Sequence, residues 1–216
     1  MVSTILCYGD SNTWGATPQP RRGDFGRFAA DVRWPGVLRA HLGAGHTVIE
    51  EGLNGRTTCI EDPVEGYHKS GTAHLIVALE SHQPLDLVII MLGTNDLKAR
   101  FAMQPVDVGF GMGKLAEIAL RSPFGPNGTA PEVLLVAPAP FAKLSWFEEM
   151  FTGGTEKSRH LAAEIAINAR EKGVHFFDAG SVISSSDNDG IHLEADAHAT
   201  LGKALADQVR SILAKG

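Results

Sequence analysis

The chain has 216 residues, of which 44% are hydrophobic and 20% are charged, and its formal net charge is −6. This length suits a single domain covering residues 1–216, and the composition is typical of a globular protein with an ordinary hydrophobic core. The negative charge and the lack of any block of lysine and arginine argue against nucleic acid or an anionic membrane as a partner.

Apolar runs alternate with helical patterns along the chain. Strands are predicted at 4–8, 47–50, 86–92, 132–137 and 174–178, helices at 35–42, 72–81, 105–121, 155–172 and 195–214, and loops at 17–33, 52–71 and 123–131. The third and fourth strands are apolar on both faces, which is typical of parallel strands covered by helices. The alternation predicts an α/β fold in which a five-stranded parallel sheet lies between two helical layers, a three-layer α/β/α sandwich.

The sequence gives no sign of membrane insertion or export. No apolar run approaches the ~18 residues needed to cross a bilayer. The first predicted strand begins within five residues of the start, which leaves no room for a signal peptide, so we expect a cytoplasmic protein. Cys7 lies in an apolar run and Cys59 in a polar loop, so we expect two unpaired thiols.

Polar or glycine-containing motifs follow the first three predicted strands. Ser11 follows the first strand, Gly55 the second and Asn95 the third. In open α/β sheets the ligand site lies beyond the carboxyl ends of the strands. We therefore expect these three residues to converge on one edge of the sheet.

Ser11 is the candidate nucleophile, and its hydroxyl needs a base to remove its proton. His192 is the candidate base, because Asp189 precedes it by three residues and Gly190 eases the turn between them. At that spacing the carboxylate can accept a hydrogen bond from the imidazole Nδ1–H and stabilise the imidazolium. Asp187 is a competing orienting acid.

The other histidines are weaker candidates. His198 follows Asp196 at a spacing of two, where helical side chains do not face each other, so we interpret it as a structural residue that anchors the last helix. The remaining seven histidines have no acid at a useful spacing and are expected to be surface or packing residues.

A tetrahedral intermediate needs hydrogen-bond donors directed at its oxyanion. The candidate donors are the Asn95 side-chain amide, the Gly55 backbone N–H and the Ser11 backbone N–H. Asp10 and Asp96 are expected to accept N–H bonds at nearby turns or helix starts. They lack further ligands at suitable spacing, so neither a metal nor a cofactor is expected.

These motifs together resemble the SGNH subgroup of the GDSL hydrolases. Gly9-Asp10-Ser11 matches the nucleophile block, Gly55 the glycine block, Gly93-Thr94-Asn95-Asp96 the third block and Asp189–His192 the fourth. More narrowly, segments 31–34, 48–53, 56–58, 85–96 and 176–183 resemble the bacterial arylesterase and acyltransferase (perhydrolase) branch. The resemblance implies the SGNH hydrolase fold, with a flavodoxin-like sheet of order 2-1-3-4-5.

The resemblance also implies an activity. It implies a serine esterase that cleaves short-chain aryl or alkyl esters through an acyl-enzyme and can transfer the acyl group to alcohols or peroxide. It further implies a homo-oligomer whose loops enclose a hydrophobic channel. Two residues depart from the branch: Asn12 stands where relatives often carry an apolar residue, which predicts a more polar acyl pocket, and Glu194 replaces a Ser or Thr helix cap.

The substrate is expected to be a small ester. The residues expected to bind it are Asn12, Trp14, Thr94, Trp146, Phe147, Phe151, Ile191 and Leu193. One alternative function is a carbohydrate or cephalosporin O-deacetylase that uses the same three catalytic residues. The other is a non-catalytic flavodoxin-like module that binds phosphate at the first strand–helix turn, where Asp10 would oppose an anion.

Overall fold

A computed structural model describes residues 2–214 of the chain. Its sheet has five parallel strands in the order β2-β1-β3-β4-β5. The strands are β1 (Ser3–Gly9), β2 (His46–Gly52), β3 (Leu87–Met91), β4 (Glu132–Ala137) and β5 (His175–Asp178). The strand order confirms the expected flavodoxin-like topology, and β3 is buried at every position, as its sequence predicts.

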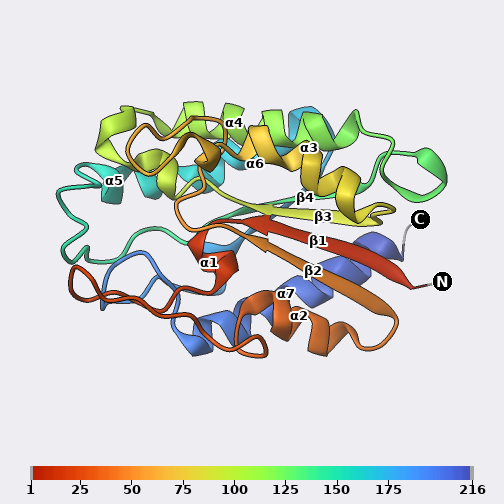
Figure 1. Cartoon of the computed structure of the whole chain (residues 1–216), viewed down its shortest axis with the longest axis horizontal. Helices are drawn as coiled ribbons and strands as arrows, with labels where there is room; N and C mark the ends of the chain where they lie inside the picture. Colours follow the sequence, from red (N-terminus) through yellow and green to blue (C-terminus); the bar gives the residue numbers. More distant parts are fainter. Residues whose placement is uncertain (1, 215–216) are drawn as a thin grey trace.

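Helices cover both faces of the sheet (Figure 1). The helices α3 (Gly71–His82), α4 (Pro105–Leu120) and α6 (Leu161–Lys172) pack on one face, and α2 (Trp34–Leu42) and α7 (Ala195–Leu213) pack on the other. Side chains alternate along β1 between the two cores: Leu6 and Tyr8 belong to the first, and Ile5 and Cys7 to the second. The three predicted layers are therefore present.

Helix boundaries agree with the predicted ones to within two residues, with one exception. The predicted helix at 155–172 is divided into α5 (Gly154–Ser158) and α6. The hydroxyl of Ser158 donates to the Thr155 carbonyl and accepts the N–H of Phe141, so this side chain competes with the helical hydrogen-bond pattern at the break. The four-residue helix α1 (Ser11–Trp14) was not predicted, because it is too short to show a periodic pattern.

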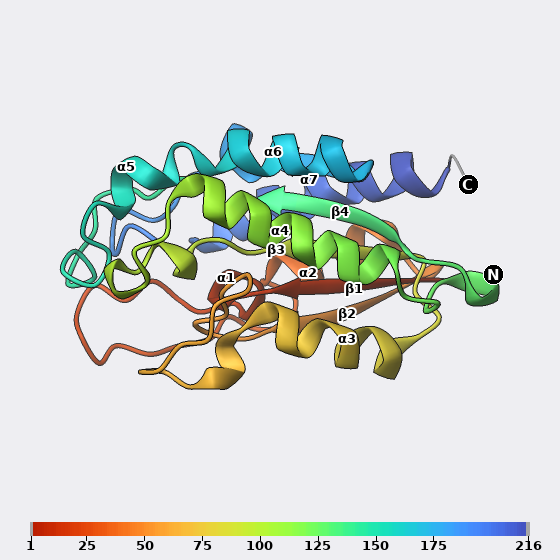
Figure 2. The same ribbon diagram turned by 90° about the horizontal axis from the view of Figure 1, so that it is seen from above.

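The carboxyl ends of the strands meet at the end of the molecule opposite both termini, where long loops gather (Figures 1 and 2). Cys7 is buried and Cys59 exposed, and neither forms a disulfide, as expected. None of the helices within residues 2–214 has the length and hydropathy required to cross a bilayer.

His198 has the structural role predicted for it. Its ring is fully buried, and its Nδ1 accepts a hydrogen bond from the Trp34 backbone N–H, which ties α7 to the start of α2. Burial lowers the pKa of His198 to about 4. A neutral imidazole is the form that can accept this bond.

Candidate active site

Ser11 is held at the tight turn that joins β1 to α1. Asp10 caps α1, and its Oδ1 accepts the backbone N–H of Asn12 at 2.9 Å. Gly9 precedes this turn, where a Cβ would lie 2.0 Å from Thr13 Oγ1 and 2.8 Å from the Met91 carbonyl oxygen. The close approach of these groups therefore requires glycine at position 9, which fixes where the Ser11 hydroxyl can lie.

His192 connects Ser11 to Asp189. Its Nε2 lies 3.1 Å from Ser11 Oγ, and its Nδ1 lies 2.6 Å from Asp189 Oδ2. Both side chains of the His192–Asp189 pair are almost fully buried. Asp187, the competing acid from the sequence, is exposed to solvent instead. The geometry thus brings the candidate nucleophile, base and orienting acid into one continuous hydrogen-bonded chain.

The Asp189 carboxylate accepts four hydrogen bonds. Its Oδ1 accepts the backbone N–H groups of Ile191 and His192, each at 2.9 Å, and its Oδ2 also accepts the N–H of Gln19 at 2.7 Å. Burial acts to raise the pKa of Asp189, but these bonds and the nearby His192 hold that pKa below its usual value. The carboxylate therefore stays ionised beside the imidazole. Gly190 makes the turn possible with φ +84°.

Asn12 fixes the segment that carries His192. Its Nδ2 donates to the Ile191 carbonyl at 3.2 Å, and its Oδ1 accepts the N–H of Leu193 at 3.2 Å. The side chain therefore joins the residue after the nucleophile to both neighbours of the base. Because both ends of the amide are occupied, Asn12 does not provide the polar pocket wall that its sequence position suggested.

Asn95 lies at the carboxyl end of β3, in the 3₁₀ turn Asn95–Leu97. Its Nδ2 donates to the Arg56 carbonyl at 3.1 Å and lies 3.4 Å from Asp10 Oδ2. Both amide protons therefore have an acceptor, and the one directed at Asp10, in the longer and weaker contact, is the one that an oxyanion would have to take over. Burial raises the pKa of Asp10 to about 6, against the hydrogen bond from Asn12 and the charge of His192.

Asp96 joins the third motif to the loop that contains Gly55. Its two carboxylate oxygens each lie 3.0 Å from the backbone N–H of Thr58, and its Oδ1 accepts the Thr58 hydroxyl at 2.5 Å. Asp96 was expected to accept hydrogen bonds at a nearby turn, but its partner is 38 residues away. Burial raises the pKa of this carboxyl to about 6.

Ser11, Gly55, Asn95 and His192 line one cavity of about 230 Å³. The apolar residues that line it are Phe25, Trp146, Phe147, Met150, Phe151 and Ile191, and the polar lining residues also include Gln19, Asn54, Glu65 and Lys98. The rings of Trp146 and Phe147 stack with centroids 4.0 Å apart, and the Phe147 ring lies 5.9 Å from the His192 ring. The aromatic pair is thus adjacent to the candidate base.

Four of the eight residues expected to bind substrate line this cavity: Trp146, Phe147, Phe151 and Ile191. The other four do not. Asn12 is described above. Leu193 packs in the core between the sheet and α7, and Thr94 is buried beside Asp10. Trp14 packs against Phe25 and under Arg27. These three side chains contact other residues and do not line the cavity.

The sequence reasoning missed Gln19, Phe25, Asn54, Glu65, Lys98 and Met150 as cavity residues. Gln19 and Phe25 lie in the long loop after α1, and nothing in its sequence indicates which of its side chains turn inward. Asn54 could have been found, because it directly precedes Gly55. Lys98 was the least expected, since its side chain is only 3% exposed.

Lys98 is buried within a group of charged residues. Its Nζ lies 2.6 Å from Glu65 Oε1 and 3.5 Å from Asp62 Oδ2. Arg100 contacts the same two carboxylates, at 2.6 Å and 2.5 Å. Burial acts to raise the pKa of Asp62, but the Arg100 hydrogen bond and its neighbours lower it to about 2. The group links the loop after β2 to the turns that follow β3.

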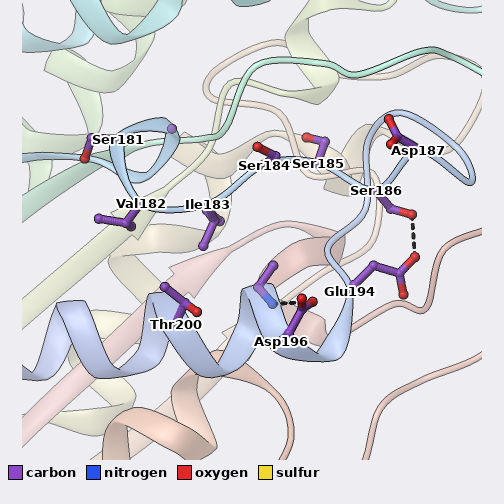
Figure 3. Close-up of a pocket in the computed structure, with 12 residues that line it drawn as sticks. Ser181, Val182, Ile183, Ser184, Ser185, Ser186, Asp187, Glu194, Asp196 and Thr200 are labelled. Carbon is purple, nitrogen blue, oxygen red and sulfur yellow. Dashed lines mark hydrogen bonds between the residues drawn. The ribbon is translucent and has the colours of Figure 1, made fainter.

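A second cavity, of about 590 Å³, lies at the start of α7 (Figure 3). It shares no lining residue with the first cavity. In this region Ser186 Oγ donates to Glu194 Oε1 at 2.5 Å, and the Ser186 backbone N–H donates to the His192 carbonyl at 2.8 Å. Glu194 makes no capping bond to α7, as its sequence position predicts, and instead braces the turn that carries Asp189 and His192.

Comparison with known proteins places the chain among ester hydrolases. The model of the GDSL-like lipase/acylhydrolase family matches residues 7–200. The aryl esterase of M. smegmatis is 48% identical, with a TM-score of 0.93 over 98% of this chain and 100% of that chain. Est24, a carbohydrate acetylesterase from Sinorhizobium meliloti, is 45% identical, with a TM-score of 0.93 over 97% of this chain and 99% of that chain.

A carbohydrate acetylesterase family member from Sinorhizobium meliloti is 38% identical, with a TM-score of 0.90 over 99% of this chain and 100% of that one. No curated protein sequence gave a match.

Proposed function

The chain belongs to the GDSL-like lipase/acylhydrolase family and is a carboxylic ester hydrolase, and we propose that it cleaves short-chain esters through an acyl-enzyme on Ser11. The observation that carries the mechanism is the continuous contact from Ser11 Oγ through the His192 ring to Asp189, at 3.1 Å and 2.6 Å. This is the arrangement that activates a serine hydroxyl, because the base is in reach and its tautomer is fixed by the carboxylate.

In the proposed reaction, His192 Nε2 takes the proton of Ser11 as Oγ attacks the ester carbonyl carbon. The carbonyl oxygen becomes an oxyanion, which accepts hydrogen bonds from the Ser11 and Gly55 N–H groups and the Asn95 amide. Collapse breaks the bond to the alcohol oxygen, which leaves with the proton held by His192. Water then attacks the acyl-enzyme with His192 as base, and the acid product and Ser11 are released.

The cavity supports a small acyl group. A volume of about 230 Å³ is below the usual range of drug-sized pockets, and Trp146, Phe147 and Phe151 are among the residues that line it. Offset aromatic contacts favour an aryl leaving group by ~0.5–1.5 kcal/mol beyond the area buried. We therefore propose aryl and alkyl esters of short acids as the substrates.

A second candidate substrate is an O-acetylated carbohydrate. One specific observation favours it: Gln19, Asn54, Glu65 and Lys98 are among the residues that line the same cavity, and such groups can pair with sugar hydroxyls. The relatives include both an aryl esterase and a carbohydrate acetylesterase. A phosphate-binding module is not proposed, because it gives the His192–Asp189 pair no role.

We also propose that alcohols compete with water for the acyl-enzyme. The apolar residues that line the cavity support this, since they disfavour bulk water next to the acyl-enzyme carbonyl. The ratio of transesterified product to free acid in aqueous ethanol measures the competition. A ratio equal to that expected from the alcohol and water concentrations alone would exclude any preference for acyl transfer.

Assembly into a homo-oligomer remains a proposal. Phe25, Val64 and Tyr67 are large apolar side chains that are each more than 60% exposed, and they lie in the loops beyond the strand ends. Light scattering coupled to gel filtration would test it, with an oligomer as the expected result and a monomer at all concentrations as the contrary one.

The test of the proposed function compares Ser11→Ala with the wild type on p-nitrophenyl acetate and on acetylated sugars. We expect Ser11→Ala to lose at least about 10³-fold in kcat/KM on every ester. Ser122→Ala is the matched control, because Ser122 is also buried but its hydroxyl bonds only the Ala119 carbonyl. Wild-type activity in Ser11→Ala would refute the nucleophile, and the ratio between substrates would separate aryl from sugar esters.

A further inference from the structure

The peptide group between Asn54 and Gly55 is contacted by a lysine. Lys69 Nζ donates a 2.8 Å hydrogen bond to the carbonyl oxygen of Asn54. That oxygen and the Gly55 N–H belong to the same planar, conjugated peptide group. The Gly55 N–H is one of the three donors assigned above to the oxyanion. A cation therefore binds one end of the peptide whose other end is the proposed oxyanion donor.

A cation at a peptide oxygen makes the N–H of the same group a stronger hydrogen-bond donor. Resonance moves electron density from nitrogen to oxygen, and an ammonium at the oxygen favours that displacement, which leaves the N–H more positive. Bonds to ionised donors are also roughly twice as strong as neutral ones. The effect increases as negative charge develops on the substrate oxygen, so it acts mainly on the transition state.

Lys69 is well placed to hold this peptide still. It ends the 3₁₀ turn Tyr67–Lys69, and its own carbonyl accepts the backbone N–H of Thr57 at 3.0 Å. The backbone of Lys69 thus fixes one end of the 54–57 loop while its side chain fixes the other. Gly55 adopts φ +79° between these two points.

The charges around Lys69 leave its ammonium free for Asn54. Glu65 lies next to Gly55, since a Cβ at that position would be 2.4 Å from its Oε2 and 3.5 Å from Lys69 Cε. Glu65 is already paired with Lys98 and Arg100 at 2.6 Å each. Within the described residues, Lys69 forms no ion pair of 4.0 Å or less.

We propose that Lys69 is a positioning residue for ester cleavage, which orients and polarises the Asn54–Gly55 peptide so that its N–H binds the oxyanion more strongly. The inference rests on the proposed function, because it requires a negatively charged tetrahedral intermediate beside Gly55. Lys69 does not touch the substrate in this account. Its contribution passes through the peptide group alone.

Three variants test the role. Lys69→Met keeps the side-chain stem but removes the charge, and we expect kcat to fall about three- to tenfold with KM unchanged, a fraction of the ~10²–10³ loss on removing a whole donor. Lys69→Arg should restore kcat to within about twofold of the wild type. Lys157→Met is the matched control: Lys157 also donates to a backbone carbonyl, that of Met103 at 2.8 Å, but it does not line the cavity.

A boronic acid inhibitor separates this role from a merely structural one. It forms a tetrahedral anion on a serine nucleophile, so its inhibition constant should rise in Lys69→Met by the same factor as kcat falls. An unchanged inhibition constant would overturn the proposal, as would a kcat in Lys69→Met equal to that of Lys157→Met. A higher KM with unchanged kcat would also overturn it, because that pattern indicates ground-state binding.

The alkaline side of the rate profile gives an independent readout. Burial lowers the pKa of Lys69 from its ordinary value, Lys98 and Arg56 act in the same direction, and Glu65 and Asp62 oppose them. The ammonium therefore loses its proton at a lower pH than a free lysine, and kcat of the wild type should fall there. The Lys69→Arg variant should lack that fall, and an identical alkaline profile in both proteins would count against the proposal.

The proposed function and the role of Lys69 can be refuted separately. If Ser11→Ala keeps its activity, the proposed function is wrong and the role of Lys69 has no basis. If Ser11→Ala is inactive and Lys69→Met is as active as the wild type at the same melting temperature, the function stands and only the inference about Lys69 is lost.

Discussion

Gln19 and Asp189 are 170 residues apart in the sequence, and the backbone N–H of Gln19 donates a 2.7 Å hydrogen bond to Asp189 Oδ2. The carbonyl of the same residue accepts the indole N–H of Trp146 at 3.0 Å. One residue of the loop after α1 thus connects the orienting carboxylate to the aromatic side of the cavity. The position of the Trp146 ring is therefore coupled to the position of the Asp189 carboxylate.

This connection predicts the effect of Trp146→Phe. The variant keeps an aromatic ring against Phe147 but loses the bond to the Gln19 carbonyl. A neutral hydrogen bond contributes about 0.5–1.5 kcal/mol, so we expect kcat/KM for p-nitrophenyl acetate to fall about two- to tenfold. Ser145→Ala is the control, because its hydroxyl lies 3.5 Å from the same carbonyl and contributes little. Equal kinetics for both variants would show that the connection has no role in catalysis.

Asn12 should affect catalysis through the backbone around His192. Asn12→Leu has a similar volume but leaves the Ile191 carbonyl and the Leu193 N–H without their partner. We expect a loss of stability of about 1–3 kcal/mol together with a fall in kcat of tenfold or more. The control is Asn168→Leu, because this buried asparagine bonds the Glu164 carbonyl far from the site and should lower stability alone. A normal kcat in Asn12→Leu would contradict the role.

Asp10 should make the folded protein less stable as the pH rises. Its pKa is about 6 when folded, above the ordinary value of 3.8, so the folded state binds a proton that the unfolded state has released. The stability that this proton provides is fully present below about pH 4 and is lost between about pH 4 and 6, by on the order of 2–3 kcal/mol. Melting temperatures across this range measure it.

Asp10→Asn tests that assignment directly. An asparagine still caps a helix, so the variant removes the ionisation and keeps the cap. We expect Asp10→Asn to become more stable relative to the wild type as the pH rises from 4 to 6. Asp187→Asn, at an exposed site, should leave the dependence of the melting temperature on pH unchanged. Parallel profiles for wild type and Asp10→Asn would rule out the raised pKa.

Phe147 should limit the length of the acyl group. It is buried against Trp146 and faces the His192 ring, so Phe147→Leu enlarges the cavity next to the nucleophile. Each buried methylene contributes ~0.8 kcal/mol, so the butyrate-to-acetate ratio of kcat/KM should rise about four- to tenfold. Phe110→Leu, on the exposed surface of α4, should leave the ratio unchanged. The same ratio in both variants would place the acyl group elsewhere.

The sequence was sufficient for the layered fold and for the convergence of Ser11, Gly55, Asn95 and the Asp189–His192 pair at the strand ends. Alternating apolar runs predict the layers, and the spacing of Asp189 and His192 predicts their contact, because three residues with a glycine turn leave little freedom. Local patterns of this kind can be recognised from the residue types and their spacing.

Other parts of the site have no such pattern. Gln19 acts through its backbone N–H and carbonyl, which every residue but proline also carries, so its identity says nothing about its role. Asn12 could be recognised as unusual, but whether its amide faces the cavity or the backbone of Ile191 depends on contacts 179 residues apart. The same is true of Lys69, because its hydrogen bond to the Asn54 carbonyl depends on how one loop folds back on itself.

The nucleophile itself can be identified by finding the residue that a fluorophosphonate modifies, using intact mass and peptide mapping. We expect one adduct per chain, on Ser11, that forms in proportion to the loss of esterase activity and much more slowly in His192→Gln. An adduct on any other residue, or full loss of activity with Ser11 unmodified, would contradict the assignment of Ser11 as the nucleophile.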